Sequence, residues 1–379
     1  DFGQRVFRTT GRWPLGLGPL ERLWWFRRER PRTYARIAHL LMISDWLIYR
    51  LSGALCSEPT NASSSLLFDI HRRAWAADLA GELGLPPTVF PPCCSPGTLA
   101  GRLQGPAAAD LGLPEGVPVA VAAADSQVAA VGCGVLAEGT AVAVAGTTMP
   151  VLMVWGEPLL DPAHRLYTGA HVLDDHWVVE ANAGLAGAAY LWFAETFAGP
   201  RPDYQGLEAE AAAARPGEVL AVIGPQIADF STLRIPPPSV FRFPFLGMTE
   251  EPPRRGGFAR AVLENIAYAV RANLEQLEAL TGGPAESLHL CGGLSHSGLL
   301  AQIVADVCDR PVHIPVVREA SWLGTAICAA VGAGLFPDLS SAVESMVRHG
   351  EPMEPGPDAR RYRSLYARWK ALLEKAYDL

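Results

Sequence analysis

Three stretches of the sequence carry residue types that could do chemistry, and the first is Val117–Gly134. Its run of small and β-branched residues, Val117–Ala124, predicts a fully buried strand that ends on a single charge, Asp125. A small-residue helix is expected to follow. Open α/β sheets bind ligands at the carboxyl ends of their strands, where a partly desolvated carboxylate can act as a base. On this stretch alone, Asp125 fits a catalytic base and a helix cap equally well.

The second stretch is a turn that could hold phosphate groups. Gly146, Thr147 and Thr148 join two β-rich runs, Thr140–Ala145 and Met149–Trp155, which predicts a hairpin with a Gly-Thr tip. Backbone N–H groups and threonine hydroxyls at such a tip can hold phosphate oxygens. Taken alone, the pattern is more often an ordinary hairpin turn.

The third stretch is Gly292-Gly293, which follows a predicted strand, Ser287–Cys291, and leads toward a predicted helix, Leu299–Cys308. The backbone can approach a ligand closely at such a turn, and a helix N-terminus favours an anion. A tight strand–helix turn without any ligand fits this pattern equally well.

Two familiar nucleotide motifs do not fit this sequence. The segment 132–137 has the GxGxxA spacing of a dinucleotide fingerprint, but it does not directly follow its strand, and no convincing strand-end acid follows at ribose-contacting distance. A GxxxxGK[ST] loop is absent. The only lysines, Lys370 and Lys375, stand near the C-terminus, which excludes a Lys-dependent phosphate loop.

The histidines and cysteines give no independent site. His164, His171 and His176 lack the spacing of a metal site, so they are expected at the surface or in turns and no metal site is predicted. Cys291, beside the glycine turn, is expected to be a small buried residue. No GxSxG motif or Cys–His pair points to a nucleophile.

Composition restricts the class of protein. The chain has 379 residues, 49% of them hydrophobic, and a net charge of −8, which is typical of a soluble globular protein of two domains or one large one. The sequence has no basic stripe, so nucleic acid is not expected as a partner. No apolar run is long enough to predict a membrane span. Seven cysteines without CxxC pairs indicate reduced thiols, as in the cytoplasm.

Elements of secondary structure must position these residues. Apolar spacing predicts one helix over Arg32–Leu51 and another over residues 68–86, whereas Gly224–Pro253 is expected to be irregular. The other predicted elements, in chain order, are a strand at His176–Glu180, helices at Ala183–Ala198 and Gly257–Leu280 (the longest), a strand at Val312–Pro315, and helices at Ser321–Gly332, Leu339–Val347 and Ala359–Ala376.

The order of the three stretches resembles that of the FGGY carbohydrate kinases, over about Val6 to Phe336. That resemblance implies an α/β fold with two actin-like, ribonuclease-H-like ATPase domains and a cleft between them. The segment 19–25, PLERLWW, is close to the first family signature, with arginine in place of the usual lysine. Asp125 stands where the family has Gly-Gly-Gly-Asp, with alanines replacing the glycines.

The nucleotide motifs of the family are matched further along the chain. Gly146-Thr147 resembles the second phosphate motif, and Gly292-Gly293-Leu294 with Ser297, followed by the segment 319–324, resembles the adenosine segment. Leu294 replaces a residue that is usually small. It is expected to narrow the nucleotide pocket while leaving a backbone N–H contact.

Within the family, the sequence looks most like autoinducer-2 kinases. The similar segments are MISDWLIYRLSG, EPTNAS at Glu58–Ser63, HVL at 171–173, IADF at 227–230, and Asp125 with Gln127. Xylulokinases come next, although they usually have asparagine directly after the catalytic aspartate, where this chain has Ser126.

The resemblance implies transfer of the γ-phosphoryl group of ATP to a hydroxyl of a small sugar or polyol, with an autoinducer-2-like ketose as one candidate. Mg²⁺ would bind together with the nucleotide, and the sugar and ATP would be the binding partners. The resemblance is also compatible with a homodimer. The implied roles are as follows: Asp125 as base, Ser126 and Gln127 at the substrate, Gly146, Thr147, Thr148 and Gly187 at the phosphates, and Gly292, Gly293, Leu294 and Ser297 at the adenosine.

Members of this family begin with a strand and a DxGT-type phosphate loop, and this segment is not found in this chain. We therefore expect residues 1–134 to be an incomplete sugar-binding domain and residues 135–379 to be the nucleotide-binding domain, in a fragment or a truncated gene product. The alternatives are a xylulokinase-type pentulose kinase, a dehydrogenase (resting only on the GxGxxA segment), and a truncated, non-catalytic sugar- or nucleotide-binding protein.

Overall fold

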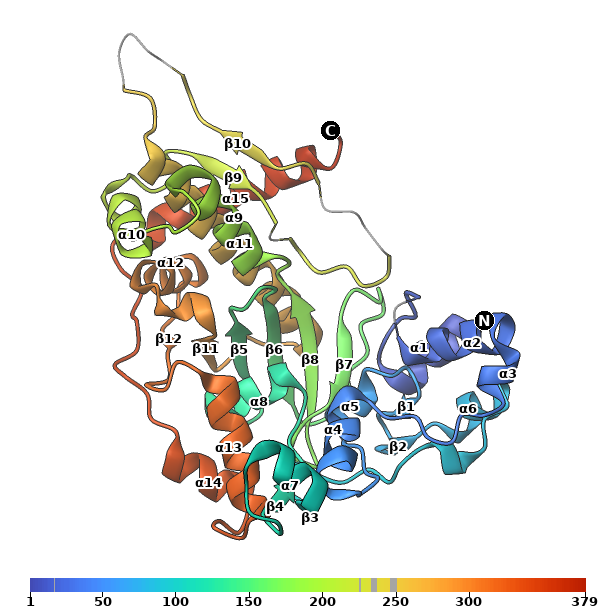
Figure 1. Cartoon of the computed structure of the whole chain (residues 1–379). Coiled ribbons are helices and arrows are strands. Elements are labelled where there is room, and N and C mark those ends of the chain that lie inside the picture. The colour runs from blue at the N-terminus through green and yellow to red at the C-terminus, as the bar shows by residue number, and fades with distance from the viewer. Residues whose placement is uncertain (17, 225, 233–236, 246–250) are drawn as a thin grey trace.

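The computed structural model describes residues 1–379 except 17, 225, 233–236 and 246–250. A mixed sheet of six strands lies at the centre of the larger part, with helices on both faces, and the N-terminal helices form a smaller body beside it (Figure 1). Among the described residues, no helix is both long and apolar enough to cross a membrane.

The six-stranded sheet has the order β12-β11-β5-β6-β8-β7. Its strands are β5 (Thr140–Val144), β6 (Pro150–Trp155), β7 (Tyr167–Ala170), β8 (Trp177–Asn182), β11 (Ser287–Cys291) and β12 (Val312–His313). β5, β11 and β12 run parallel, whereas β6 is antiparallel to both β5 and β8. The carboxyl ends of β5, β8 and β11 therefore meet at one edge of the sheet.

The two faces of the sheet are covered differently. On one face the main core packs against α9 (Ala186–Ala198), α10 (Tyr204–Ala213), α11 (Arg255–Thr281), α12 (Gly298–Cys308) and α15 (Ala359–Ala376). The other face carries α8 (Asp125–Gly132) and the start of α13 (Ala320–Gly332), and α14 (Leu339–Met346) packs outside them. A small antiparallel pair, β9 (Leu220–Val222) and β10 (Val240–Arg242), lies at the α15 end.

The N-terminal body consists of short elements. These elements are α1 (Phe2–Thr10), α2 (Pro19–Glu29), α3 (Pro31–Tyr34), α4 (Ile43–Ser52), α5 (Pro59–Ser63), α6 (Ala77–Leu83), the 3₁₀ turn η1 (Pro87–Val89), α7 (Gly105–Leu111), and two hairpins, β1 (Phe68–Asp69) with β2 (Ala74–Trp75) and β3 (Leu99–Arg102) with β4 (Pro118–Ala120). Of these, α1, α2, α6 and η1 pack around an apolar cluster of their own. Gly11, at φ 71°, ends α1 and accepts a hydrogen bond from Thr168 N on β7, which ties this body to the sheet.

Most elements predicted from the second half of the sequence are confirmed. The hairpin with the tip at 146–148 is present, because Ala141 pairs with Met153 across β5 and β6. The strand Ser287–Cys291 and the helix Ala359–Ala376 have the predicted bounds, and α11 is the longest described helix.

Two helices predicted from the first half are wrong. The run Arg32–Leu51 is interrupted at residues 35–42, where Leu40 donates its N–H to Val89 O and Asp45 begins α4 by accepting from Met42 N. Residues 68–86 are only partly helical, because their first half forms the β1–β2 hairpin before α6. In both segments the apolar residues recur at helical spacing in the sequence, although the backbone does not form one continuous helix.

Of the histidines expected at the surface or in turns, His171 lies in the turn that joins β7 to β8 and is fully buried there. Its Nδ1 accepts from Leu173 N, and burial lowers its pKa to about 3, so the ring is neutral. His164 is stacked on Trp13 with ring centroids 4.3 Å apart. All seven cysteines lie in the described ranges and are unpaired, with Cys291 fully buried as expected.

Candidate active site

The Gly-Thr tip and the helix that follows β8 are joined through their backbones. Gly187, in the first turn of α9, donates its N–H to Gly146 O at 3.1 Å, and Ala188 donates to Thr147 O at 3.3 Å. A Cβ at Gly187 would overlap Gly146 O, so only glycine allows this approach. Thr147 and Thr148 are exposed at the tip. The fold therefore places Gly187 beside the Gly-Thr tip, as expected.

The Gly-Gly turn lies beside the same tip. Ala145 donates its N–H to Cys291 O at 2.7 Å, and Gly292, at φ 86°, has no room for a Cβ because Ala145 lies against it. Gly293, by contrast, is exposed, with nothing within 4 Å of the place where a Cβ would stand. The two glycine turns thus form one continuous surface at the carboxyl ends of β5 and β11.

Two details of this surface differ from the sequence expectation. The N–H of Leu294, expected to stay available to a nucleotide, is donated to Ala145 O at 3.1 Å. The hydroxyl of Ser297 caps α12 by accepting from Leu300 N, and it also donates to Glu208 Oε1 at 3.0 Å. Both groups therefore have structural partners that sequence spacing alone does not reveal.

The buried strand predicted before Asp125 is wrong. β4 covers only Pro118–Ala120, pairs antiparallel with β3 at the edge of a two-stranded sheet, and leaves Val117 37% exposed. Asp125 is an exposed first residue of α8, and its Oδ1 accepts from Ser126 N at 2.7 Å. Its position is set by α8, and not by the end of a sheet strand.

A polar cavity of about 180 Å³ nevertheless lies beside Asp125. Its lining comes from both parts of the chain, with Arg12, Thr60, Asn61 and Ser64 from the N-terminal body, Asp125 and its neighbours from α8, and Gly169, Ala170, Val178 and Glu180 from the sheet. The lining includes Ser126 and Gln127, the other two residues expected at the substrate. The structure thus brings all three of these residues to one cavity.

Gln127 is, with Thr60, one of the buried polar side chains in this lining. It is 7% exposed, and its Nε2 donates to Ala170 O at 3.2 Å. Its Oε1 is buried and makes no hydrogen bond within the described ranges. An unsatisfied buried acceptor costs free energy, so a hydrogen bond to this oxygen would be favourable.

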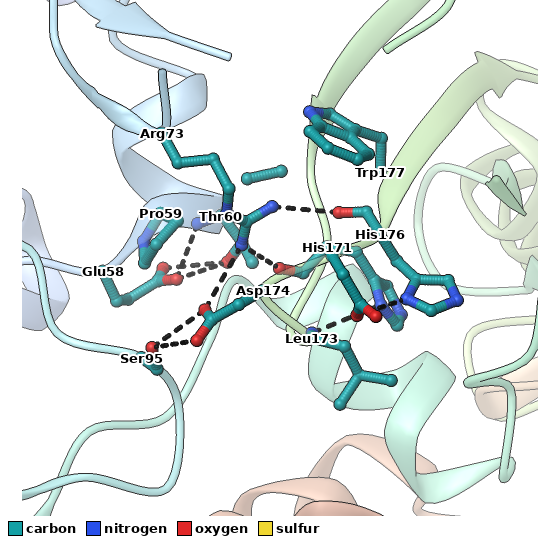
Figure 2. A network of polar contacts seen from close by, with 12 residues as sticks. Glu58, Pro59, Thr60, Arg73, Ser95, His171, Leu173, Asp174, His176 and Trp177 are labelled. Atoms are coloured by element: carbon teal, nitrogen blue, oxygen red, sulfur yellow. Dashed lines mark hydrogen bonds and ion pairs between the residues drawn. The ribbon is translucent and has the colours of Figure 1, made fainter. Parts of the chain in front are cut away.

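Helix α5 fixes the start of α8 through Thr60. The Thr60 hydroxyl donates to the Glu58 carboxylate (2.7 Å to Oε2) and accepts from Ala124 N at 2.8 Å (Figure 2 shows Glu58 and Thr60). Glu58 also accepts from the N–H groups of Thr60 and Asn61, both at 2.7 Å. The EPTNAS segment therefore holds the peptide that precedes Asp125.

Arg73 secures the connection between β7 and β8 on the same side. Its guanidinium donates to the carbonyl oxygens of His171 and His176 at 3.0 and 2.9 Å, and Asp174 lies 3.7 Å away (Figure 2). Ser95 donates to the same Asp174 carboxylate. These contacts join the β1–β2 hairpin to the sheet next to Ala170, and so they support one wall of the cavity.

Stability is expected to fall as pH rises through neutrality, partly because of Glu58. Burial raises its pKa from 4.5 to about 7, against the hydrogen bonds that favour the charged form. A raised folded-state pKa stabilises fully below 4.5, and this contribution is lost as pH rises through about 7. The loss amounts to at most about 3 kcal/mol. Urea unfolding from pH 5 to 8 should measure it.

Glu58→Gln is the matched control, because glutamine keeps the shape of the side chain and does not ionise. Glu264, whose pKa burial also raises to about 7, adds a slope of the same sign in both proteins. The difference between wild type and Glu58→Gln therefore isolates Glu58. Parallel stability curves for the two proteins would contradict the prediction.

Sequence reasoning missed the pair of Arg12 and Glu180 in the cavity. Arg12 Nη2 lies 3.3 Å from Glu180 Oε2, and the side chains are 17% and 21% exposed. Burial and the nearby Asp125 raise the pKa of Glu180, whereas Arg12 lowers it. The available signal was a single acid inside WVVEAN, an otherwise mostly apolar strand. Arg12 carried no signal, because its loop reaches β7 only through the fold.

The two groups of candidate residues are separate but close. No hydrogen bond among the described residues joins the glycine turns to the Asp125 cavity. Glu180 of the cavity stands two residues before Asn182, the end of β8. Two residues of strand span about 7 Å, so the cavity opens near the edge that carries the Gly-Thr tip.

The arrangement is that of a two-domain, actin-like α/β kinase, and solved structures share it. Xylulose kinase from Rhodospirillum rubrum superposes with a TM-score of 0.82 at 25% identity, covering 100% of this chain and 76% of that one. Gluconate kinase from Lactobacillus acidophilus has a TM-score of 0.84 at 18% identity, over 99% and 75% of the two chains. At that identity the second match bears on the fold alone.

Sequence comparison identifies the family. Residues 3–132 match the N-terminal domain of the FGGY family of carbohydrate kinases, and residues 141–333 match its C-terminal domain. Autoinducer-2 kinases of Salmonella choleraesuis and Escherichia coli are 32% and 31% identical, over 98% and 100% of this chain and 72% and 73% of their own lengths. The chain belongs to the FGGY family of carbohydrate kinases.

Proposed function

We propose that this chain is an ATP-dependent carbohydrate kinase that phosphorylates a hydroxyl of a small sugar or polyol. The observation that carries the proposal is the cavity of about 180 Å³ beside Asp125, whose lining combines that carboxylate with the Ser126 and Gln127 side chains. That space corresponds to about six waters, which suits part of a small polyol. The autoinducer-2 kinases among the relatives favour a ketose of that class.

In this proposal Asp125 accepts the proton of the attacking hydroxyl, because its exposed carboxylate lines the cavity. Ser126 and Gln127 hold neighbouring hydroxyls. Thr60 fixes the backbone before Asp125 through its bond with Ala124 N. Catalysis in this class is mainly positioning and neutralisation of charge, so a fixed base is what the reaction needs.

ATP is the second substrate, and the glycine-turn surface is the proposed place for it. Gly146, Thr147 and Thr148 would hold the phosphates, with Gly187 beneath them, and Gly292, Gly293, Leu294 and Ser297 would border the adenosine. The open backbone at Gly293 leaves room for close approach. Mg²⁺ carried by the nucleotide would neutralise phosphate charge; within the described ranges, no group of three acidic, histidine or cysteine side chains could hold a metal.

In this proposal residues 1–134 form the sugar-binding domain and residues 135–379 form the nucleotide-binding domain. A xylulokinase-type activity on a pentulose is the second candidate, supported by the fold match to a xylulose kinase at 25% identity. A non-catalytic binding protein is the third. The GxGxxA segment gives a dehydrogenase no support, because Gly132 is enclosed against Ala320 and cannot meet a dinucleotide.

Gly187→Ala is expected to weaken ATP binding by about tenfold, because the added Cβ overlaps Gly146 O and displaces the tip. Titration calorimetry with ATP and Mg²⁺ measures the change. Gly283→Ala is the matched control, since its Cβ meets nothing within 4 Å. An unchanged ATP affinity in Gly187→Ala would remove the nucleotide from this surface.

The function is tested by ADP release in a coupled assay with a panel of ketoses, aldoses and polyols. Release that depends on one class of sugar supports the kinase. Nucleotide binding without turnover of any sugar would favour the binding protein. Because relatives are longer than this chain, the protein should be expressed with any coding sequence found upstream of Asp1.

A further inference from the structure

The structure assigns a discriminating role to Arg12 and Glu180: we infer that this pair makes the cavity selective for neutral polyhydroxyl substrates over sugar acids. The inference rests on the proposed function, because it concerns the substrate of the same cavity.

The pair crosses the boundary between the two parts of the chain. Arg12 follows α1 in the N-terminal body, and its loop is tied to β7 by the bond between Gly11 O and Thr168 N. Glu180 lies on β8, directly opposite Tyr167 of β7. The Arg12 guanidinium stacks over the Tyr167 ring at 4.4 Å, which fixes its plane against the sheet. The pair is therefore held from two sides and not by a flexible surface contact.

The pair retains hydrogen-bonding capacity toward the cavity. Arg12 and Glu180 are joined by one bond of 3.3 Å, between Nη2 and Oε2, and not by two parallel bonds. Arg12 Nε is buried and has no hydrogen-bond partner among the described residues. Gln127 Oε1 is likewise buried and unpaired among the described residues, so two residues of the lining carry one unsatisfied donor and one unsatisfied acceptor. Hydroxyl groups, which donate and accept, can satisfy both.

The charges of the cavity disfavour an anionic ligand. Among the described residues, Arg12 is the one cation in the lining and is already paired with Glu180, while Asp125 adds a negative charge that has no ion-pair partner there. A ligand carboxylate would meet this excess negative charge in a partly desolvated space, where charges interact more strongly than in water. A neutral polyol avoids that repulsion and keeps the hydrogen bonds.

The test compares ribitol with D-ribonate, which share a five-carbon chain and differ in the terminal carboxylate. Calorimetric titration of wild type should show ribitol bound at least about tenfold more tightly than ribonate, since repulsion provides the discrimination. Glu180→Gln should weaken ribitol binding by about tenfold and tighten ribonate, because Arg12 is then free to bind the carboxylate.

The double variant Arg12→Gln/Glu180→Gln shows whether ribonate binds more tightly because Arg12 is freed or because the cavity has lost its structure. Without Arg12, the higher affinity for ribonate should disappear, while ribitol should bind as weakly as it does to Glu180→Gln. Glu157→Gln, at an exposed turn outside the cavity, is the control and should leave both affinities unchanged. An unchanged ribitol-to-ribonate ratio in Glu180→Gln, or absence of ribitol binding to wild type, overturns the inference. Binding with the expected ratio but no phosphoryl transfer would instead overturn only the kinase.

Discussion

Asp125→Asn is expected to lower kcat for sugar phosphorylation by about 10²- to 10⁴-fold, because asparagine keeps the shape of the side chain and cannot accept the hydroxyl proton. The affinity for ATP should be unchanged, since no hydrogen bond or ion pair among the described residues joins Asp125 to the glycine turns. The measurement is steady-state ADP release at saturating sugar, with ATP affinity by calorimetry.

The control for this substitution is Asp110→Asn, an exposed carboxylate in α7 outside the cavity. It should retain wild-type activity. Equal activity of wild type and Asp125→Asn would remove Asp125 from the chemistry, and a loss of folded protein on thermal unfolding would show that the substitution acted on stability instead.

Gly324→Ala is expected to destabilise the fold by about 3 kcal/mol, because α13 crosses α8 backbone to backbone. A Cβ at Gly324 would overlap Val128 O, and one at Gly132 would overlap Ala320 O. Neither obstacle is a side-chain end that can rotate away, so the two helices must separate. Denaturant unfolding should register the loss as a lower midpoint with an unchanged slope.

A glycine in open surroundings supplies the opposite expectation. Gly81 is exposed inside α6, where a Cβ meets nothing within 4 Å. Gly81→Ala should stabilise the protein by about 0.5–1 kcal/mol through helix propensity alone. If Gly324→Ala proved as harmless as Gly81→Ala, close packing of α8 on α13 would not be what holds Asp125 in place.

The sequence was most informative where local pattern and tertiary position coincide. The tip at 146–148 and the turn at Gly292-Gly293 each directly follow a strand that is visible in the sequence as a short β-rich run. Local pattern was therefore sufficient to predict both turns. The carboxyl ends of parallel strands in one sheet lie at the same edge, and β8 runs parallel to β5 and β11, which explains why Gly187 joins them.

The sequence was least informative around Asp125. The run before it has the composition of a buried strand, yet it lies at the edge of a short hairpin, because β3 is its only strand partner among the described residues and the six-stranded sheet is built from later segments. The residues that hold Asp125 are distant in sequence: Thr60 acts through a single hydroxyl, and Gly324 through the absence of a side chain. Neither leaves a periodic pattern to find.

Arg12 and Glu180 illustrate a second limit. A charged residue in a strand stands out in the sequence, but its partner can be identified only once two segments 168 positions apart are known to meet. Family resemblance did not supply this pair either, since no motif includes Arg12.

The central claim is that this chain transfers a phosphoryl group to a neutral sugar held beside Asp125. Phosphorus NMR of the protein with ATP, Mg²⁺ and the best-bound neutral sugar tests it most directly. The account predicts a new phosphomonoester resonance that grows in step with ADP, requires the sugar, and is nearly abolished in Asp125→Asn. Formation of ADP and inorganic phosphate without a phosphomonoester, or a phosphomonoester formed equally fast by Asp125→Asn, would contradict it.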